Sequence, residues 1–561
     1  MESYYQARWE VLPTAPTEYL DAANLPPPIA QLLYNRGLKL GEIETFLAAG
    51  PSLVDNPFLF PDMSQAVNRI YQALLSGEKI AIYGDFDVDG ITAIAILVEG
   101  LSWLGGKATP YIPDRLKEGH GLAWPAIEKL HSQGARLIIT VDCGITNLTE
   151  AKQAREIGVD MIITDHHMPL KMLPQVIAVI DPKRKDSSYP FHDLAGVGVA
   201  FKLLQALFHK DSREKSLTGF LDLVTLGTVT DMVPIVGENR YLVKEGLRVL
   251  NSTPRIGLQE LIKLAKLELG KLDTESISWV LGPRLNAASR MDNASASYRL
   301  LTTNSLQEAH HLATRLEEKN AERQRLTNKI LNKVKEKLAT KMHLPLLTES
   351  DEGYPVGVIG LVAGKLVDEF CKPAIIINLG PEVCRGSTRS IPEFNIADAL
   401  EKYRDLLITF GGHPLAAGFT VARQNLPALE EKLMSLAENQ LSHLDLRPKL
   451  VIDAEAPLST FTGNIISLIQ QLEPFGQSNP QPTFLAHRVK VVDSRNFGNQ
   501  SKHLELKLKQ GDITWRAVSF NSQKAQSEIP SYIDIVYKVK KSFWAGEEVL
   551  DLNLLDFAPS G

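Results

Sequence analysis

The sequence predicts a multidomain α/β protein that ends in a small antiparallel β-barrel or β-sandwich. Its 561 residues exceed what one hydrophobic core normally serves, so we expect three or four domains. From about residue 78, short apolar runs alternate with amphipathic stretches, the pattern of a parallel sheet with crossover helices. From about residue 488, apolar residues instead alternate with polar ones, which indicates antiparallel strands.

Composition indicates a cytoplasmic globular protein with no membrane segment. Hydrophobic residues make up 44% of the chain and charged residues 22%, an ordinary globular balance. No apolar run approaches the roughly 18 residues that span a membrane, and the N-terminus lacks the features of a secretory signal. The three cysteines, Cys143, Cys371 and Cys384, have no CxxC spacing, which suits a reducing compartment and argues against a thiolate metal site. The net charge of −6 does not exclude nucleic acid, because a site for divalent cations is itself rich in carboxylates.

The first half of the chain predicts a helical lead-in over residues 1–70 and a doubly wound domain over 71–304. The runs KIAIYGDF, ATPYI, RLIITVD, DMIITD and QVIAVID are typical of buried strands. The stretches between them at 91–104, 122–133 and 147–157 are typical of helices, and the chain becomes mainly helical from about 197 to 300. This alternation predicts a parallel sheet covered by helices on both faces.

Residues 305–342 predict one long connecting helix. Leu326, Ile330, Val334 and Leu338 are spaced by four, as on one face of a helix. Basic residues outnumber acidic ones along it. We favour a solvated connector with some helix ion pairs, while the wall of a DNA channel is the alternative.

The remainder predicts a smaller α/β domain over residues 343–442 and a β domain over 443–561. In the smaller α/β domain, AIIINL indicates a strand and 357–370 a helix. In the β domain, the alternation of ITWRAVSF places Trp515 in the core, opposite Arg516. Phe543 and Trp544 are adjacent and cannot both face inward in a regular strand, so Trp544 fits a core role and a surface role equally.

The strongest chemical signal lies at the ends of the predicted strands. The first strand leads into Asp85, Asp87 and Asp89, which would point to the same side of an extended chain, and Gly90 would permit a tight turn into the next helix. The third strand ends at Asp142, and the fourth ends at Asp165-His166-His167. Because the carboxyl ends of parallel strands share one crevice, we expect these groups to converge.

Such a cluster predicts a site for two divalent cations. Crowded carboxylates repel one another unless cations neutralise them, and mixed oxygen and nitrogen ligands favour Mn²⁺ or Mg²⁺. Two ions would activate a water and hold a phosphoryl group. Each motif alone has a structural interpretation, since a lone DxD is usually a turn, Asp142 fits a helix cap, and Asp85 and Asp181 fit strand-end loops. The coincidence of three motifs at strand ends favours the metal site.

The order of motifs resembles the DHH phosphoesterase superfamily. GDFDVDG, VDCG, TDHH and LGTVTDMVP match its four motifs in order, and YPFHDLAGVGVAFKL is similar to its RecJ family in particular. The resemblance extends from about residue 30 to the C-terminus. It implies one ion held by Asp87 and Asp142, with Asp85 as a further candidate. It implies a second ion whose ligands are Asp89, Asp142, His166 and Asp231, with Asp142 shared, and it gives the catalytic roles to His167, Asp142 and His166. His167 would contact the scissile phosphate.

Three further segments resemble substrate-binding parts of the same family. GPRLNAASR at 282–290 is similar to a segment that contacts the DNA backbone, which implies roles for Arg284, Asn286 and Arg290. The second α/β unit resembles the DHHA1 domain through GGHPLAAG at 411–418 and RGSTRSI at 385–391. LEPFGQSNP at 472–480 resembles the start of the family's OB-like domain, whose barrels bind single strands by basic grooves and aromatic stacking. The substrate-binding residues implied by the DHHA1-like domain are Ser387, Arg389 and His413, and the barrel of the OB-like domain adds Trp544.

The resemblance implies a metal-dependent exonuclease that hydrolyses phosphodiester bonds of single-stranded DNA from the 5′ end. The expected setting is DNA repair and recombination, alongside a helicase and a single-strand-binding protein, and we expect a monomer. Two other functions stay open. A phosphodiesterase for short oligonucleotides or cyclic dinucleotides is disfavoured by the 120-odd residues of barrel pattern after the DHHA1-like unit. A non-catalytic scaffold is disfavoured by the intact carboxylate and histidine set.

Overall fold

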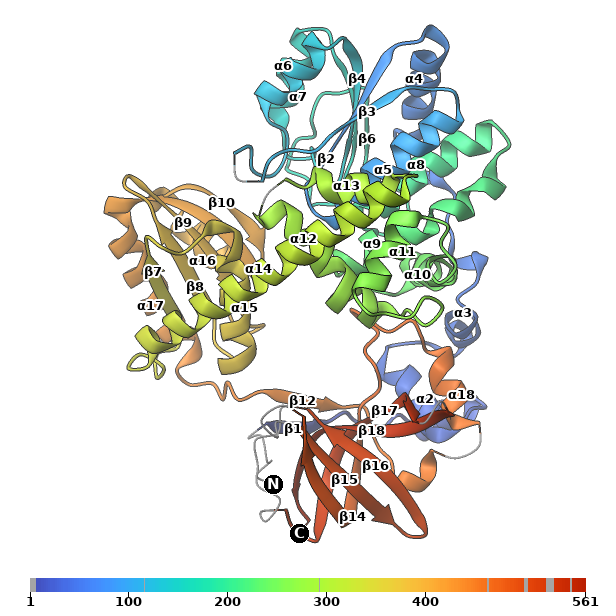
Figure 1. Cartoon of the computed structure of the whole chain (residues 1–561), viewed down its shortest axis with the longest axis vertical. Helices are drawn as coiled ribbons and strands as arrows, with labels where there is room; N and C mark the ends of the chain where they lie inside the picture. Colours follow the sequence, from blue (N-terminus) through green and yellow to red (C-terminus); the bar gives the residue numbers. More distant parts are fainter. Residues whose placement is uncertain are drawn as a thin grey trace. The chain divides into compact units, whose positions relative to one another are not determined.

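The computed structural model (Figure 1) divides into two compact units, one of which is built from both ends of the chain. One unit combines Met1–Leu53 with Arg447–Gly561, and the other comprises Val54–Leu446. The structure describes residues 7–115, 117–291, 293–461, 464–498, 503–520, 529–544 and 547–560, without the side chains of 541–549. Within the described residues, no helix is both long enough and apolar enough to cross a membrane.

The 54–446 unit begins with a parallel sheet in the order β3-β2-β4-β5-β6. The strands are β2 (Lys79–Gly84), β3 (Ala108–Tyr111), β4 (Ala135–Val141), β5 (Asp160–Thr164) and β6 (Ala178–Ile180). The helices around it are α4 (Met63–Ser76), α5 (Val88–Trp103), α6 (Trp124–Ser132), α7 (Leu148–Glu156) and α8 (Gly196–Lys210). Ile80 and Ile82 pack into the core shared with α4, α5 and α8, whereas Ala81 and Tyr83 pack into the core shared with α6 and α7. The predicted doubly wound sheet is therefore confirmed, and Figure 1 shows α6 and α7 on the opposite side of the sheet from α4.

The strand order places a crevice between β2 and β4. The chain leaves β2 toward β3 on one side and then returns to β4 on the other side. The crossover connections therefore diverge beyond the carboxyl ends of these two strands, which is where open α/β sheets bind ligands. Asp85 follows β2 directly and Asp142 follows β4 directly. The sheet topology thus brings the first two predicted carboxylate motifs together.

A helical region follows the sheet, as the sequence predicts. It contains α9 (Leu221–Thr230), α10 (Gly237–Leu250), α11 (Ile256–Leu264), a short π-helix (Ser276–Leu281), α12 (Gly282–Met291) and α13 (Ser295–Thr302). The long connecting helix is α14 (Leu306–Leu338), capped by the Ser305 hydroxyl, which accepts from the Glu308 N–H. Leu312 and Leu316 of α14 pack into the core of this region, and Ile330 and Val334 pack against α15. The helix is therefore a shared part of two hydrophobic cores as well as a connector.

The second sheet is mixed and has the order β10-β11-β9-β8-β7. Its strands are β7 (Leu347–Asp351), β8 (Ala374–Leu379), β9 (Val383–Arg389), β10 (Leu407–His413) and β11 (Ala416–Ala422). Its helices are α15 (Val356–Phe370), α16 (Ile396–Lys402) and α17 (Leu426–Leu441). Only β7 and β8 pair in parallel, and the other neighbours are antiparallel. The predicted AIIINL strand is β8, and the predicted helix over 357–370 is α15.

The C-terminal sheet closes into a five-stranded barrel. Its strands are β14 (Phe484–Phe497), β15 (His503–Gln510), β16 (Ile513–Ser519), β17 (Tyr532–Trp544) and β18 (Glu547–Pro559). They pair in the order β14-β15-β16-β18-β17, and β17 pairs back with β14. The short β13 (Ala454–Glu455) extends β14 on one side. The structure decides for the barrel over the sandwich, and Trp515 lies in the barrel core, as predicted.

The N-terminal segment packs with this barrel. β1 (Arg8–Val11) pairs in parallel with β12 (Lys449–Ile452), a four-residue strand that the helical prediction missed. The helices α1 (Thr17–Ala22), α2 (Pro27–Asn35) and α3 (Ile43–Ala48) follow. Ile29, Leu32 and Leu33 of α2 belong to the same buried cluster as the barrel core and α18 (Ile465–Gln471). The two ends of the chain therefore share one hydrophobic core.

Candidate metal and phosphate site

The first carboxylate motif forms a helix N-terminus. Asp87 is the N-cap of α5, and its Oδ1 accepts from the N–H groups of Asp89 (3.0 Å) and Gly90 (3.2 Å). The predicted extended path through Asp89 is therefore wrong, because the helix has already begun at Val88. The turn separates the three carboxylates. Asp85 and Asp87 lie in one group with Asp142, and Asp89 lies in another.

The structure explains the glycine at position 90 by close packing and not by the predicted tight turn. Gly90 lies inside α5 and is not among the residues with a positive φ, so the tight-turn interpretation is wrong. A Cβ at this position would lie 2.5 Å from the backbone oxygen of Asp85. Glycine therefore allows the first turn of α5 to pack directly on the loop that carries Asp85.

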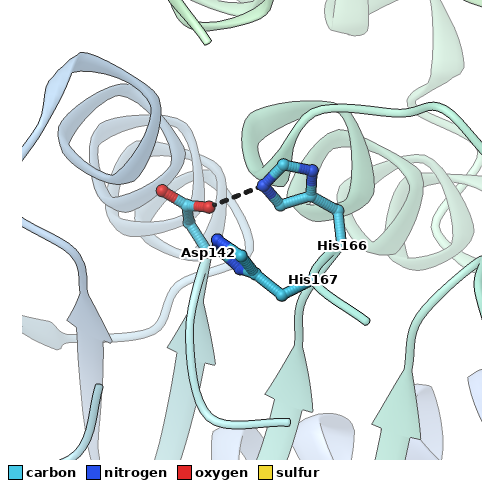
Figure 2. A group of neighbouring side chains, drawn as sticks. All are labelled: Asp142, His166 and His167. Atoms are coloured by element: carbon cyan, nitrogen blue, oxygen red, sulfur yellow. Dashed lines mark ion pairs between the residues drawn. The ribbon is translucent and has the colours of Figure 1, made fainter. Parts of the chain in front are cut away.

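Asp142 occupies the centre of the site. Its φ of +58° is in the left-handed region that a non-glycine residue adopts at a cost, a feature that clusters at functional sites. Its Oδ1 lies 3.1 Å from Nε2 of His166, and Figure 2 marks this ion pair with a dashed line. The same carboxylate belongs to two groups of metal-ligand type, one with Asp85 and Asp87 and one with His166 and His167, in which the ligand atoms lie within 4.8 Å of one another.

His166 joins Asp142 to a further group. Its Nε2 lies 3.7 Å from Oδ2 of Asp231 and 4.0 Å from Oδ2 of Asp89. Asp89 in turn accepts from the N–H groups of Gly196 (2.6 Å) and Val197 (2.8 Å) at the N-terminus of α8. Asp231 follows the last residue of α9, so a helix end delivers it to the site. No local sequence pattern marked Asp231, and only the family resemblance pointed to it.

Asp165 organises the two histidines. Its Oδ1 accepts from the N–H groups of His166 (2.7 Å) and His167 (3.2 Å) and lies 2.8 Å from Nδ1 of His167. Its Oδ2 accepts from the N–H of Ile145 at 2.9 Å. Burial alone would lower the pKa of His167, but the ion pair with Asp165 raises it to about 9. The sequence assigned no role to Asp165, whose carboxylate contacts the His167 ring and the N–H groups of both histidines.

The electrostatics of this cluster suit bound cations. Burial, followed by repulsion from Asp85 and Asp231, raises the pKa of Asp87 to about 6. Burial and neighbouring carboxylates raise the pKa values of Asp89 and Asp142 well above their usual range. Both ring nitrogens of His166 and Oδ1 of Asp85 are buried and have no hydrogen-bond partner among the described residues. A set of oxygen and nitrogen donors with unsatisfied atoms and uncompensated charge fits hard divalent ions.

Four half-buried arginines lie near one another, and two of them, Arg115 and Arg290, interact with Asp87 of the carboxylate cluster. Arg115 comes from the loop after β3, Arg290 from α12, Arg323 from α14 and Arg389 from β9. Burial and repulsion from the other three arginines lower the pKa of Arg290 to about 9, while attraction by the Asp87 carboxylate acts in the opposite direction and raises it. Guanidinium groups held together against their repulsion are suited to a phosphate. Arg290 and Arg389 were predicted as substrate-binding residues, whereas Arg115 and Arg323 are single arginines with no distinguishing pattern.

Two other predicted phosphate contacts are engaged within the protein. Arg284 forms hydrogen bonds to both carboxylate oxygens of Glu317, at 2.5 and 3.2 Å, and to the carbonyl of Val280. Asn286 Oδ1 accepts from the N–H of Val88 at 3.1 Å, at the start of α5. The two residues therefore fix α12 against α14 and α5. Their roles as DNA contacts stay predictions.

The domain built on the second sheet, β7 to β11, contributes side chains to the same site. His413, at the end of β10, stacks on His167 with ring centroids 6.4 Å apart and an interplanar angle of 21°. Ser387 and Arg389 lie on β9, which packs so closely on α15 that a Cβ at Gly360 would lie 2.8 Å from the Ser387 hydroxyl. The structure thus places His413 against His167 and Arg389 in the arginine group around Arg290. The side chain of Trp544 lies outside the described residues.

The fold and the site together define the class of protein, and comparisons with known proteins agree. The DHH family N-terminal domain matches residues 79–228, the DHHA1 domain matches 336–439, and the RecJ OB domain matches 452–556. With a carboxylate and histidine cluster at the switch point of the first sheet, this combination defines a DHH-type phosphoesterase.

Relatives that match nearly all of this chain identify the particular family. The protein from Bacillus subtilis (strain 168) named single-stranded-DNA-specific exonuclease RecJ is 37% identical over 96% of this chain and 68% of its own length. The Dickeya dadantii (strain 3937) protein of the same name is 31% identical over 96% of this chain and 97% of its own. A crystal structure of RecJ from Thermus thermophilus in complex with Mn²⁺ matches with a TM-score of 0.84 at 29% identity, covering 99% of this chain and 80% of that one. The chain belongs to the RecJ family of exonucleases, which confirms the predicted family, fold class and enzyme class.

The packing of Gly196 against Asp142 gives a test of the site. A Cβ on Gly196 would lie 2.5 to 2.7 Å from three atoms of the Asp142 side chain. Gly196→Ala should therefore displace that carboxylate and weaken Mn²⁺ binding by about 10- to 100-fold, as displaced ligand supports do. Calorimetric titration with Mn²⁺ measures the loss.

The matched control for this change is Gly219→Ala. There the added Cβ meets its nearest neighbour, Trp103, at an ordinary 3.8 Å, so Mn²⁺ affinity should not change. An unchanged affinity in a folded Gly196→Ala protein would exclude Asp142 from the metal site.

Proposed function

We propose that the protein removes nucleotides stepwise from the 5′ end of single-stranded DNA by hydrolysis that depends on two divalent ions, Mn²⁺ or Mg²⁺. The observation that carries the proposal is a group of four neighbouring arginines, two of which, Arg115 and Arg290, interact with Asp87 of the Asp and His cluster. Such a site attracts metal ions and phosphate oxygens to neighbouring positions. The names of the relatives, single-stranded-DNA-specific exonuclease, support the substrate and the reaction.

The chain offers ligands for two ions. Asp85, Asp87 and Asp142 would hold one, and the second would take Asp89, His166 and Asp231 together with the shared Asp142. Bound divalent ions would lower the pKa of water and polarise the phosphoryl group. Crystal structures of Thermus thermophilus RecJ in complex with Mn²⁺ and with Mg²⁺ support the choice of metal; the Mg²⁺ complex matches with a TM-score of 0.77 at 26% identity and covers 99% of this chain and 79% of that one.

His167 would stabilise charge on the scissile phosphate. Asp165 holds Nδ1 of the ring, so the other nitrogen is the one that can donate to a phosphate oxygen. In the metal-free protein Asp165 raises the pKa of the imidazole to about 9, which favours a ring N–H that can donate to an anion. His413 stacks against the same ring and limits its rotation.

The arginine cluster would bind phosphates next to the one that is cut. Arg115, Arg290 and Arg389 carry forked donors that match phosphate oxygens, and Ser387 adds a hydroxyl on the same strand as Arg389. The end of a DNA strand bound by these side chains would have its terminal phosphodiester bond positioned at the metal ligands. The 5′-to-3′ direction itself follows from the family resemblance, because the chemistry of these residues does not select an end.

The biological setting remains part of the proposal. We place the enzyme in DNA repair and recombination in the cytoplasm, supplied with single strands by a helicase and acting beside a single-strand-binding protein. We also propose that it acts as a monomer.

Labelled substrates test the reaction and its direction. With Mn²⁺ and 3′-labelled single-stranded DNA, we expect labelled products that shorten gradually, and a 5′ label should appear at once in the smallest product. EDTA should stop both reactions, and the same strand in a blunt duplex should resist. Early release of a 3′ label would reverse the direction, and an intact strand under all metal conditions would overturn the exonuclease proposal.

A further inference from the structure

The chain between β3 and α6 carries a histidine that contacts the carboxylate cluster. Nδ1 of His120 lies 3.2 Å from Oδ2 of Asp85. In this pair the ring N–H donates, because an ionised carboxylate only accepts. The His120 side chain is 69% exposed, whereas Asp85 is buried. A surface residue of this loop therefore contacts a buried residue of the candidate metal site.

The two oxygens of the Asp85 carboxylate have different surroundings. Oδ2 accepts from His120, whereas Oδ1 is buried and has no hydrogen-bond partner among the described residues. Asp85 also forms a group with Asp87 and Asp142 in which the ligand atoms lie within 4.8 Å of one another. His120 belongs to none of the ligand groups found in the described part of the chain. The arrangement is that of a ligating carboxylate and a neighbour that holds it by a hydrogen bond.

The same loop packs on Phe86, the residue after Asp85. The rings of His120 and Phe86 have centroids 4.4 Å apart, and the guanidinium of Arg115 lies 4.9 Å from the Phe86 centroid. Phe86 is completely buried. Burial lowers the pKa of Arg115, while attraction by Asp85 and Asp87 acts in the opposite direction and raises it. The loop therefore joins a candidate metal ligand to a candidate phosphate-binding arginine through one aromatic ring.

Hydrogen bonds on both sides of His120 anchor the loop. Before it, the Glu118 carboxylate accepts from the Tyr111 hydroxyl at 2.7 Å, at the end of β3. After it, the carbonyl of Gly121 accepts from the Tyr83 hydroxyl at 3.1 Å. Gly121 has a φ of +82°, which lets the chain turn directly after the histidine. The imidazole is therefore presented by an anchored turn, although most of its surface is in contact with solvent.

We infer that His120 is a positioning residue of the first metal site, where it orients the Asp85 carboxylate. With Oδ2 held by the imidazole, Oδ1 is the oxygen available to the ion that Asp87 and Asp142 also hold. Hydrogen-bond partners of ligating groups set their orientation, and removing such a partner weakens metal binding although every ligand is still present. The inference rests on the proposed function, because it concerns one of the two ions which that function requires.

Calorimetric titration of the metal-free, full-length protein with Mn²⁺ measures this role without DNA. His120→Ala should weaken Mn²⁺ binding at one site by about 10-fold and leave the other site unchanged. His120→Asn should bind Mn²⁺ as the wild type does, because the asparagine amide can donate from nearly the position of Nδ1. The matched control is His209→Ala, at the opposite end of α8 from the site. The His209 side chain is 67% exposed, lies 2.8 Å from a carboxylate oxygen of Glu214 and contacts the ring of Phe58, so its removal should not change Mn²⁺ affinity.

Cleavage at different Mn²⁺ concentrations gives a second readout. Because His120→Ala keeps every ligand, its kcat should be low at limiting Mn²⁺ and return to the wild-type value when Mn²⁺ is raised about 10-fold, while KM for single-stranded DNA stays the same. Equal Mn²⁺ affinities for the wild type and His120→Ala, or a kcat that excess Mn²⁺ does not restore, would overturn the inference. Loss of one ion in both His120→Ala and His120→Asn would make His120 a ligand and contradict its positioning role. Failure of the wild type to cut DNA would instead overturn the proposed function, and the titrations would still be readable.

Discussion

Replacement of Asp142 by asparagine should abolish metal-dependent cleavage while the protein stays folded. Asp142 is the carboxylate shared between two groups of candidate ligands, so losing its charge weakens both ions at once. A Lewis-acid metal is worth several kcal/mol in transition-state stabilisation, so we expect a loss on the order of 10³-fold or more in kcat/KM. Gel assays with single-stranded DNA and Mn²⁺ measure it.

The same change should stabilise the metal-free protein. Burial and repulsion raise the pKa of Asp142 in the folded state, so its charged form opposes folding at neutral pH. Asp142→Asn removes that opposition, and its melting temperature without metal should rise while its stabilisation by Mn²⁺ shrinks. Asp160→Asn is the control: Asp160 lies at the opposite end of the sheet, where β5 begins, and accepts from Arg69 at 2.6 Å, so its loss should not raise the melting temperature and should leave stabilisation by Mn²⁺ unchanged. Undiminished cleavage by the Asp142→Asn protein would contradict the assignment of the site.

Lys202→Met should cost about 3–5 kcal/mol of unfolding free energy, the usual loss when one partner of a buried ion pair is removed. Nζ of Lys202 on α8 lies 2.8 Å from Oε1 of Glu238, and both side chains are fully buried. Nζ also donates to the carbonyl of Asp55, and the Tyr189 hydroxyl donates to Glu238. Methionine would leave the Glu238 carboxylate in the core without its cation. Denaturant unfolding monitored by circular dichroism measures the change.

The matched experiment replaces both partners. Lys202→Met combined with Glu238→Gln removes the unpaired charge and should recover part of the lost stability. Because the N-terminus of α8 donates to Asp89, the single variant should also bind Mn²⁺ more weakly. Equal unfolding midpoints for the wild type and Lys202→Met would show that the ion pair adds nothing.

The regular elements were largely predictable because their patterns are local. AIIINL is β8 over the same residues, and the four-residue spacing from Leu326 to Leu338 falls within α14. Alternation in the C-terminal runs also gave the strands and the inward position of Trp515. In each case one face of the helix or strand is buried, so apolar residues recur along the sequence with the period of that element. This hydrophobic period can be recognised without knowing which residues the buried face contacts.

The site was predictable only in part because its members converge from separate elements. Asp87 and Asp142 were marked by their place at strand ends, whereas Asp231 lies at the end of a helix where acidic residues are ordinary. Arg115 and Arg323 come from a loop and a long helix whose charges look like solvent-exposed ones. The error at Asp89 has a physical cause, since an Asp87 side chain that caps the following N–H groups starts a helix two residues earlier than strand alternation would allow.

The sharing of one core by both ends of the chain has a consequence for synthesis. The apolar face of α2, with Ile29, Leu32 and Leu33, packs against residues that follow position 447. At about 5–20 residues per second, the ribosome needs roughly 20–80 seconds to make the intervening segment. During that time the nascent chain exposes the apolar face of α2, while the 54–446 unit can already fold. The α2 segment is therefore translated long before its partners, and a chain arrested before the barrel would be a natural target for chaperones and proteases.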